Sequence, residues 1–212
     1  MNYLAHLYLA RQSHPAMLGA LLGDFVFGRI ALEDYAPQVR REIVIHRRVD
    51  RYTDTHPRVS AARALFPEGR RRYAGIVLDV YYDHCLARAW SRHSDQPLDA
   101  FTAPFYAYLL QRLDALPERL RRIAPLMAAH DWLGGYRERG NVDRAVARIA
   151  GRLSRNGERL VDGLHDLRRH EAEIAAGFEA FFPQLQAYVE QVRGALALPP
   201  GDGDVGDVLA GR

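Results

Sequence analysis

Apolar residues recur at helical spacing along most of the chain, and alternating runs of the β type between hairpin turns are hard to find. The pattern therefore predicts an all-α fold. We expect helices over residues 2–12, 15–28, 36–54, 57–65, 69–93, 98–115, 117–138, 141–160 and 164–195. Prolines mark several of the expected starts, and three more fall inside longer helices, where they favour a kink or an interruption: Pro104, Pro125 and Pro183.

Residues 1–198 are expected to form a single helical domain. The chain has 212 residues, of which 48% are hydrophobic, and this is enough to bury a substantial core. Residues 199–212 are rich in Gly, Pro and Asp and have little to bury. We therefore expect them to form a flexible C-terminal tail.

Composition also indicates where the chain works. No uninterrupted apolar run approaches the roughly 18 residues of a membrane span, and the start MNYLAHLYLA, interrupted by His6, is typical of a core helix and not of a signal peptide. Cys85 is the only cysteine, so an intrachain disulfide and a cysteine-based zinc site are excluded. We expect a cytoplasmic protein with no membrane partner.

The basic residues are all arginines, 29 against 26 acidic residues, which leaves a formal charge of +3. This balance favours an acidic partner or a phosphate-bearing substrate. Within the expected helix 141–160, arginines form one stripe: Arg144, Arg148, Arg152, Arg155 and Arg159. The stripe is either an ordinary solvated face or a docking surface for an acidic protein, and no nucleic-acid motif supports a nucleic-acid partner.

The first candidate for chemistry is LDVYYDHCL, where Asp79, Asp83 and His84 interrupt an apolar run. On a helix the two carboxylates project from one face, and His84 lies about 100° further round. Like charges at this spacing repel unless a cation lies between them. The alternative to a metal site is that these three side chains form a buried polar network.

A second candidate is IVIHRRVDRYTD, where His46, Asp50 and Asp54 repeat at four-residue intervals beside apolar residues. Asp24 lies in the glycine-rich GALLGDFVFG, either as a helix cap or as a further ligand. His6, alone between leucines, is more typical of a hydrogen-bonded core histidine than of a ligand. A mixed set of imidazoles and carboxylates suits Mn, Fe or Zn better than Ca.

The motifs MNYLAHL, LLGDFV, HRRVDRYTD and LDVYYDHCLARAW, in this order, resemble the acyl carrier protein phosphodiesterase (acyl carrier protein hydrolyase) family. DWLGGYRERG and RRHEAEIAAGFEAFFP extend the resemblance over nearly the whole chain except the tail. That family is similar to the HD-type metal phosphohydrolases. The resemblance implies a helical HD-like fold and an Mn-dependent hydrolysis, with Fe, Zn or Mg as other metals. The positions that match the polar motif residues of the family are Asp24, His46, Asp50, Asp79, Asp83 and His84.

The reaction implied by the resemblance cuts the phosphodiester between phosphopantetheine and a serine of holo acyl carrier protein, an acidic partner. Our hypothesis is that metal-activated water attacks phosphorus. Asp83 or His84 would move the proton, and Arg47, Arg48 or Arg51 would clamp the phosphate. Two alternatives stay open: another HD-type phosphohydrolase acting on nucleotides or small phosphoesters, and a non-catalytic helical protein that binds carrier protein.

Overall fold

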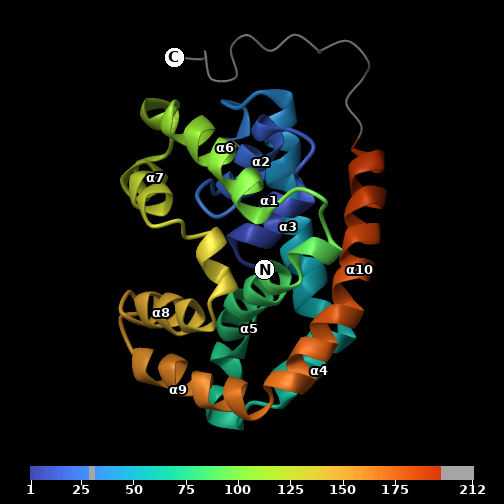
Figure 1. Cartoon of the computed structure of the whole chain (residues 1–212), viewed down its shortest axis with the longest axis vertical. Coiled ribbons are helices and arrows are strands. Elements are labelled where there is room, and N and C mark those ends of the chain that lie inside the picture. The colour runs from blue at the N-terminus through green and yellow to red at the C-terminus, as the bar shows by residue number, and fades with distance from the viewer. Residues whose placement is uncertain (29–31, 197–212) are drawn as a thin grey trace.

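The computed structural model describes residues 1–28 and 32–196 and confirms the all-α prediction, since these residues contain no β-strand (Figure 1). Their α-helices are α1 (Tyr3–Leu9), α2 (His14–Leu22), α3 (Pro37–Thr55), α4 (Pro57–Ala64), α5 (Glu68–Arg88), α6 (Leu98–Leu110), α7 (Glu118–Ala129), α8 (Arg139–Ala150), α9 (Gly157–Arg169) and α10 (Glu171–Ala195). Short 3₁₀ helices cover Trp90–Arg92, Leu113–Ala115 and Gly134–Arg137. The expected tail, 199–212, lies outside the described residues.

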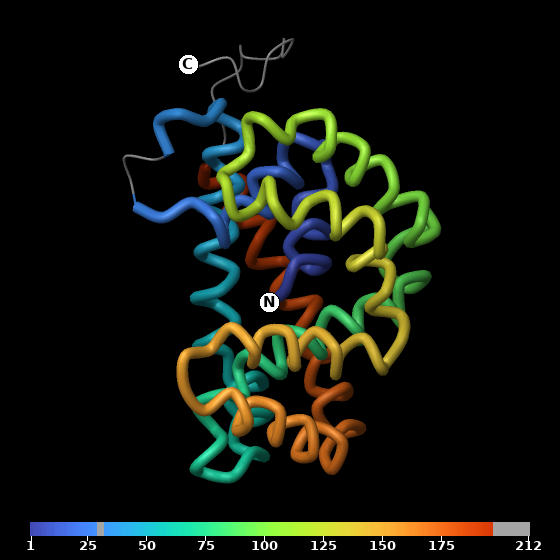
Figure 2. The backbone as a smooth tube through the Cα atoms, turned by 90° about the vertical axis from the view of Figure 1, so that its left-hand side faces the viewer, coloured from blue at the N-terminus to red at the C-terminus, as the bar shows by residue number. Residues whose placement is uncertain are grey.

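Helix α1 lies at the centre of the molecule, where every residue from Leu4 to Leu9 is buried. It packs against α2 and α5, and α2 packs in turn along α3. The long helix α10 runs down one side of the molecule in Figure 1. In Figure 2 the start of α1 lies at mid-height, below α6 and α7 and above the orange pair α8 and α9. The N-terminal segment is therefore surrounded by elements from the whole chain.

The helix starts follow ordinary capping chemistry. The hydroxyl of Ser13 accepts a hydrogen bond from the backbone N–H of Ala16 at 3.2 Å, which caps α2. Prolines occupy the first turns of α2, α3 and α4, where a missing N–H costs nothing. These signals explain why the starts were predicted more closely than the ends.

Helix α3 carries its polar motif at the edge of a buried face. Val39, Ile43, His46 and Val49 follow one another at intervals of three or four residues and are all buried. Asp50 is the next residue after Val49, and its side chain remains 40% exposed. The sequence of α3 thus places an imidazole inside the core and a carboxylate at its rim.

The expected helix 141–160 is wrong, because α8 ends at Ala150 and α9 begins at Gly157. Asn156 has a left-handed backbone with φ 58°, which ends the helical geometry. Apolar residues continue at helical spacing across the break, so hydrophobic periodicity alone does not reveal where the helix ends. The arginine stripe is therefore not one surface: Arg144 and Arg148 lie on α8, and Arg159 lies on α9.

Other boundaries also differ. The expected helix 164–195 is two helices separated by His170 alone, and α2 ends at Leu22 instead of continuing to residue 28. The expected helix 117–138 ends at Ala129, and Asp131 then has φ 42°. The three internal prolines do not end their helices, since α6, α7 and α10 each continue past theirs. Among the described residues, no helix combines the length and the apolar character that a membrane crossing requires.

Candidate metal site

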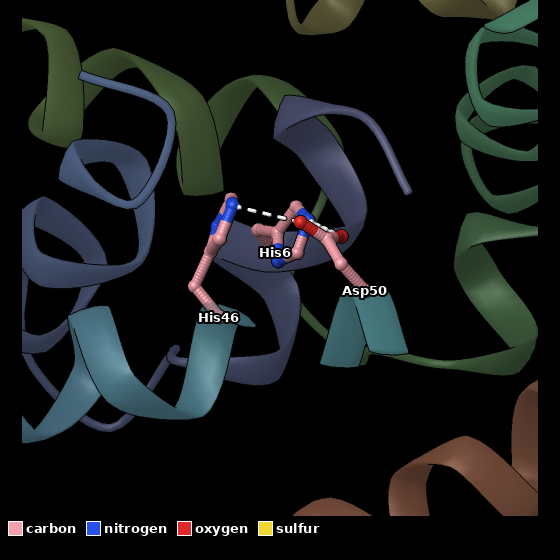
Figure 3. Close-up of side chains that lie close together, drawn as sticks. All are labelled: His6, His46 and Asp50. Carbon is pink, nitrogen blue, oxygen red and sulfur yellow. Dashed lines mark hydrogen bonds and ion pairs between the residues drawn. The ribbon is translucent and has the colours of Figure 1, made fainter. Parts of the chain in front are cut away.

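His6, His46 and Asp50 form a compact group of possible metal ligands (Figure 3). The Nε2 atoms of His6 and His46 each lie 3.1 Å from a different oxygen of the Asp50 carboxylate. One ligand atom from each of the three residues falls within 4.8 Å of the others. Two nitrogens and a carboxylate oxygen therefore converge between α1 and α3.

The His46 ring is held in one orientation. Its Nδ1–H donates to the backbone carbonyl of Ala20 at 2.8 Å, so Nε2 faces Asp50. A backbone partner on the far nitrogen is the usual arrangement for a metal-binding histidine. Gly23 makes room for the ring, because a Cβ at that position would lie 2.1–2.6 Å from its atoms.

The two imidazoles differ in charge. Burial and the nearby His46 lower the pKa of His6 to about 4, although Asp50 raises it in part. Burial also lowers the pKa of His46, but hydrogen bonds to Asp24 and Asp50 outweigh it and raise the value to about 9. Their rings stack with centroids 3.8 Å apart. At neutral pH without metal, His6 is therefore neutral, whereas His46 is positively charged and attracts the neighbouring carboxylates.

Two further carboxylates flank the group. Asp24, in the turn after α2, lies 3.6 Å from His46 Nε2 and is 42% exposed. Asp79 on α5 lies 3.0 Å from the amino group of Met1, which is also 3.4 Å from Asp50. The structure thus brings Asp24, His46, Asp50 and Asp79 into one neighbourhood from three separate segments.

The donor set fits a divalent metal ion. Imidazole nitrogens and carboxylate oxygens together suit Mn, Fe or Zn. The exposed fractions of Asp24, Asp50 and Asp79 lie between 37% and 42%, so one side of the group meets solvent and can admit a substrate.

Comparison with known proteins places this site in a family. The family model described as acyl carrier protein phosphodiesterase matches residues 1–185. The chain belongs to the acyl carrier protein phosphodiesterase family. A relative from Serratia proteamaculans (strain 568) bearing that name is 39% identical over 186 residues, which cover 87% of this chain and 95% of the relative.

Two further relatives, from Salmonella dublin and Salmonella agona, bear the same name. Each is 37% identical over 188 residues, covering 88% of this chain and 96% of the relative. No solved structure matches the chain. The likeness to the HD-type fold therefore stays a prediction.

Asp83, expected to be a ligand or a proton carrier in this family member, instead holds the start of α1. Its two carboxylate oxygens accept hydrogen bonds from the backbone N–H groups of Leu4 at 2.7 Å and Ala5 at 3.0 Å. The first N–H groups of a helix have no partner within the helix. Asp83 therefore supplies a cap from another helix, and its expected role as a ligand or proton carrier stays a prediction.

His84 also lies apart from the group. Its Nδ1–H donates to the carbonyl of Tyr136 at 2.6 Å, and its side chain is buried. Its Nε2 atom has no hydrogen-bond partner among the described residues. His84 thus links the 3₁₀ segment Gly134–Arg137 to α5, and its expected role in metal binding or catalysis stays a prediction.

The arginines of the HRRVDR motif differ in their surroundings. Arg47 donates to the carbonyls of Val26 at 2.8 Å and Gly28 at 3.3 Å, so it secures the loop after Asp24. Arg48 and Arg51 are exposed on the surface. Arg47 thus contacts the loop, and the expected phosphate clamp stays a prediction.

His6 is the residue that sequence reasoning missed as a ligand candidate. A lone histidine among leucines is usually a core residue, and His6 is indeed only 2% exposed. The available signal was a buried polar side chain in an otherwise apolar stretch of helix. A buried imidazole needs a partner, and here the partner comes from α3.

Proposed function

We propose that this chain is a metal-dependent phosphodiesterase that hydrolyses the bond between phosphopantetheine and a serine of holo acyl carrier protein. The products are apo acyl carrier protein and phosphopantetheine. The observation that carries this proposal is the convergence of His6, His46 and Asp50 in a chain of this family. We also propose the cytoplasm as its location, because the chain has one cysteine and that cysteine is free.

The metal would be held by His6 Nε2, His46 Nε2 and Asp50, with Asp24 and Asp79 as flanking carboxylates. We propose Mn, with Fe, Zn and Mg as the alternatives. A bound ion of this kind stabilises negative charge on phosphoryl oxygens and lowers the pKa of water. Loading would release the Nε2 proton of His46, since a metal and that proton need the same lone pair.

The remaining residues orient the metal ligands and move protons. Asp83 fixes the start of α1 and so sets the position of His6. The leaving serine oxygen must gain a proton, and Asp83 and His84 remain our candidate donors.

The decisive experiment follows the mass of the carrier protein. Purified protein is incubated with holo acyl carrier protein and Mn²⁺, and intact-protein mass spectrometry reports whether the phosphopantetheine mass is lost. We expect conversion to the apo form, with free phosphopantetheine in the filtrate. Chelator should stop the conversion, and added Mn²⁺ should restore it.

Three control reactions separate the alternatives. Asp50→Asn should abolish conversion, whereas Asp54→Asn should not, since Asp54 lies four residues on and pairs with Arg63 at the surface. Unchanged holo protein together with turnover of nucleotides would favour a different phosphohydrolase. Binding of holo protein without any turnover would favour a non-catalytic role.

A further inference from the structure

A cavity of about 510 Å³ lies between α7, the Gly134–Arg137 segment and α8. We call it the α7–α8 pocket, and the lining residues that matter below are Leu126, Trp132, Tyr136, Asn141, Arg144 and Arg148. Its volume is in the range of small-molecule sites, which is roughly 300–1,000 Å³. The roles described so far leave this pocket unused.

The lining combines an aromatic surface with hydrogen-bond donors. The guanidinium of Arg148 lies 4.4 Å from the centre of the Trp132 ring. Arg144 donates to the side-chain oxygen of Asn141, whose amide group donates to Gly135. At the rim, Leu126 is 49% exposed, one of few large apolar side chains so open to solvent among the described residues. Such a lining suits a chain that carries both apolar groups and carbonyl oxygens.

The charge of the pocket is positive. Arg144 and Arg148 face a single lining carboxylate, Asp131. That carboxylate already accepts hydrogen bonds from the Tyr106 hydroxyl at 3.2 Å and the Gly134 N–H at 3.1 Å. The arginines therefore keep hydrogen-bonding capacity for acceptor atoms of a ligand.

A short series of contacts links the inner wall of the pocket to the metal site. Tyr136 is buried, and its hydroxyl accepts a hydrogen bond from the Asn2 side chain at 2.5 Å. The next residue back, Met1, contacts Asp50 and Asp79 through its amino group. Asn2 and Met1 therefore connect Tyr136 to the carboxylates of the metal site. In Figure 2, α7 and α8 lie above and below the N-terminal end of the chain.

We propose that the α7–α8 pocket binds the pantetheine arm of the substrate, a proposal that rests on the proposed function. The arm is a flexible chain with a branched apolar group, two amides and a terminal thiol. Trp132 and Leu126 would contact the apolar group, and Arg144 and Arg148 would donate to the amide carbonyls. A concave pocket of this size suits such a chain better than it suits the convex surface of a partner protein.

The test compares three substrates of decreasing size: holo acyl carrier protein, the methyl phosphodiester of 4′-phosphopantetheine, and bis(p-nitrophenyl) phosphate. The first two contain the arm, and only the first contains protein. The variant is Arg144→Gln combined with Arg148→Gln. We expect KM to rise roughly tenfold or more for the first two substrates, the effect of losing a hydrogen bond to a charged donor, with no change for the third.

A matched control is Arg155→Gln, which removes an exposed arginine outside the pocket lining. It should leave all three KM values unchanged. A rise in KM for holo protein alone would assign the arginines to protein docking and overturn the arm proposal. Unchanged KM for both arm-bearing substrates would also overturn it.

Binding of free pantetheine, measured by isothermal titration on the wild-type protein and on Trp132→Ala, separates this inference from the proposed function. If wild-type protein fails to release phosphopantetheine from holo protein, the proposed function fails. If wild-type protein hydrolyses holo protein but Trp132→Ala binds pantetheine as well as wild type does, the pocket assignment fails alone. Trp132→Phe should retain most of the binding, since it keeps an aromatic surface.

Discussion

Asp50 is the residue on which the candidate site depends, because its two oxygens each face a different imidazole. Burial raises the pKa of this carboxyl, but hydrogen bonds to His46 and His6 hold it far below the ordinary value. Asp50 is therefore ionised at any working pH. A permanently charged carboxylate between two imidazoles is a ready ligand for a divalent ion.

Replacing Asp50 with Asn should weaken Mn²⁺ binding by at least about tenfold. Loss of a residue that only supports a ligand typically costs 10- to 100-fold, and loss of a ligand should cost at least as much. Isothermal titration with Mn²⁺ measures the effect. Asp54→Asn, on the same helix, should bind Mn²⁺ as wild type does. Equal affinity in the Asp50 variant would contradict the assignment.

For Asp83 the prediction concerns stability, because its two hydrogen bonds hold the start of α1. Asp83→Ala leaves two buried N–H groups without partners, so we expect a loss of about 3 kcal/mol in the free energy of unfolding. Urea denaturation in the presence of chelator reports this loss apart from metal binding. Asp114→Ala, at an exposed position, should change stability by less than about 0.5 kcal/mol. A loss as small in the Asp83 variant would contradict the capping role.

Asp83 should also make the stability of the protein depend on pH. Burial raises the pKa of Asp83 from 3.8 to about 7, although the N–H groups of Ala5 and Leu4 lower it. The folded state therefore favours the neutral carboxyl group. This contribution to stability is complete below about pH 4 and is lost as pH rises through about 7.

The asparagine side chain of the Asp83→Asn variant does not titrate in this range. The free energy of unfolding of wild type minus that of Asp83→Asn should therefore fall between pH 5 and pH 8, when both are measured by urea denaturation. A difference that stays constant or rises across this range would show that the carboxylate is stabilised by its two N–H donors more than burial destabilises it.

At the scale of elements, the contact between α2 and α3 positions His46. A Cβ on Gly19 would lie 2.4 Å from the carbonyl oxygen of Val39, and a Cβ on Gly23 would overlap the His46 ring. The two helices can approach this closely only because both positions are glycine. The glycines of GALLGDFVFG are thus part of the site through packing.

Gly23→Ala should displace the His46 ring and lower Mn²⁺ affinity roughly tenfold, because the ring loses its fixed orientation. Overpacking should also cost about 1–3 kcal/mol of stability. The matched control is Gly177→Ala in α10, where an added Cβ meets nothing within 4 Å. It should raise stability by about 0.5–1 kcal/mol and leave Mn²⁺ binding unchanged. Wild-type Mn²⁺ affinity in Gly23→Ala would show that the ring tolerates displacement.

The sequence predicted the helices better than it predicted their ends. Apolar periodicity located every long helix, but it cannot detect a single-residue break such as His170 or a left-handed residue such as Asn156. Those breaks depend on local backbone conformation, which leaves the spacing of apolar residues intact. The arginine stripe was a consequence of the missed break between α8 and α9.

For the site, four-residue spacing found His46 and Asp50, and the glycine-rich motif found Asp24. The sequence did not distinguish metal ligands from residues that support the fold. A buried carboxylate can serve equally well as a metal ligand and as a cap for a distant helix. Which of the two Asp83 becomes depends on where α1 begins in space. His6 was missed for the same reason, since its partner lies 44 residues away on another helix.

At the scale of the whole molecule, a single hydrophobic core extends from Met1 to Val192 and includes residues of all ten described helices. The net charge of the molecule is carried mainly by its surface. With 29 arginines against 26 acidic residues, the chain carries a formal charge of +3 and attracts an acidic protein over distances longer than a contact.

The expected result is a KM for holo acyl carrier protein that rises with salt. The Debye length falls from ~30 Å at ~0.01 M to ~8 Å at ~0.15 M ionic strength, so long-range attraction weakens over this range. Steering acts on the encounter between the two proteins, and kcat should therefore stay nearly constant. Steady-state kinetics at several NaCl concentrations measure both constants. The KM for bis(p-nitrophenyl) phosphate, which is too small to benefit from steering between protein surfaces, is the internal control. If both substrates respond to salt alike, salt acts on the metal site itself, and the surface charge has no part in recognising the carrier protein.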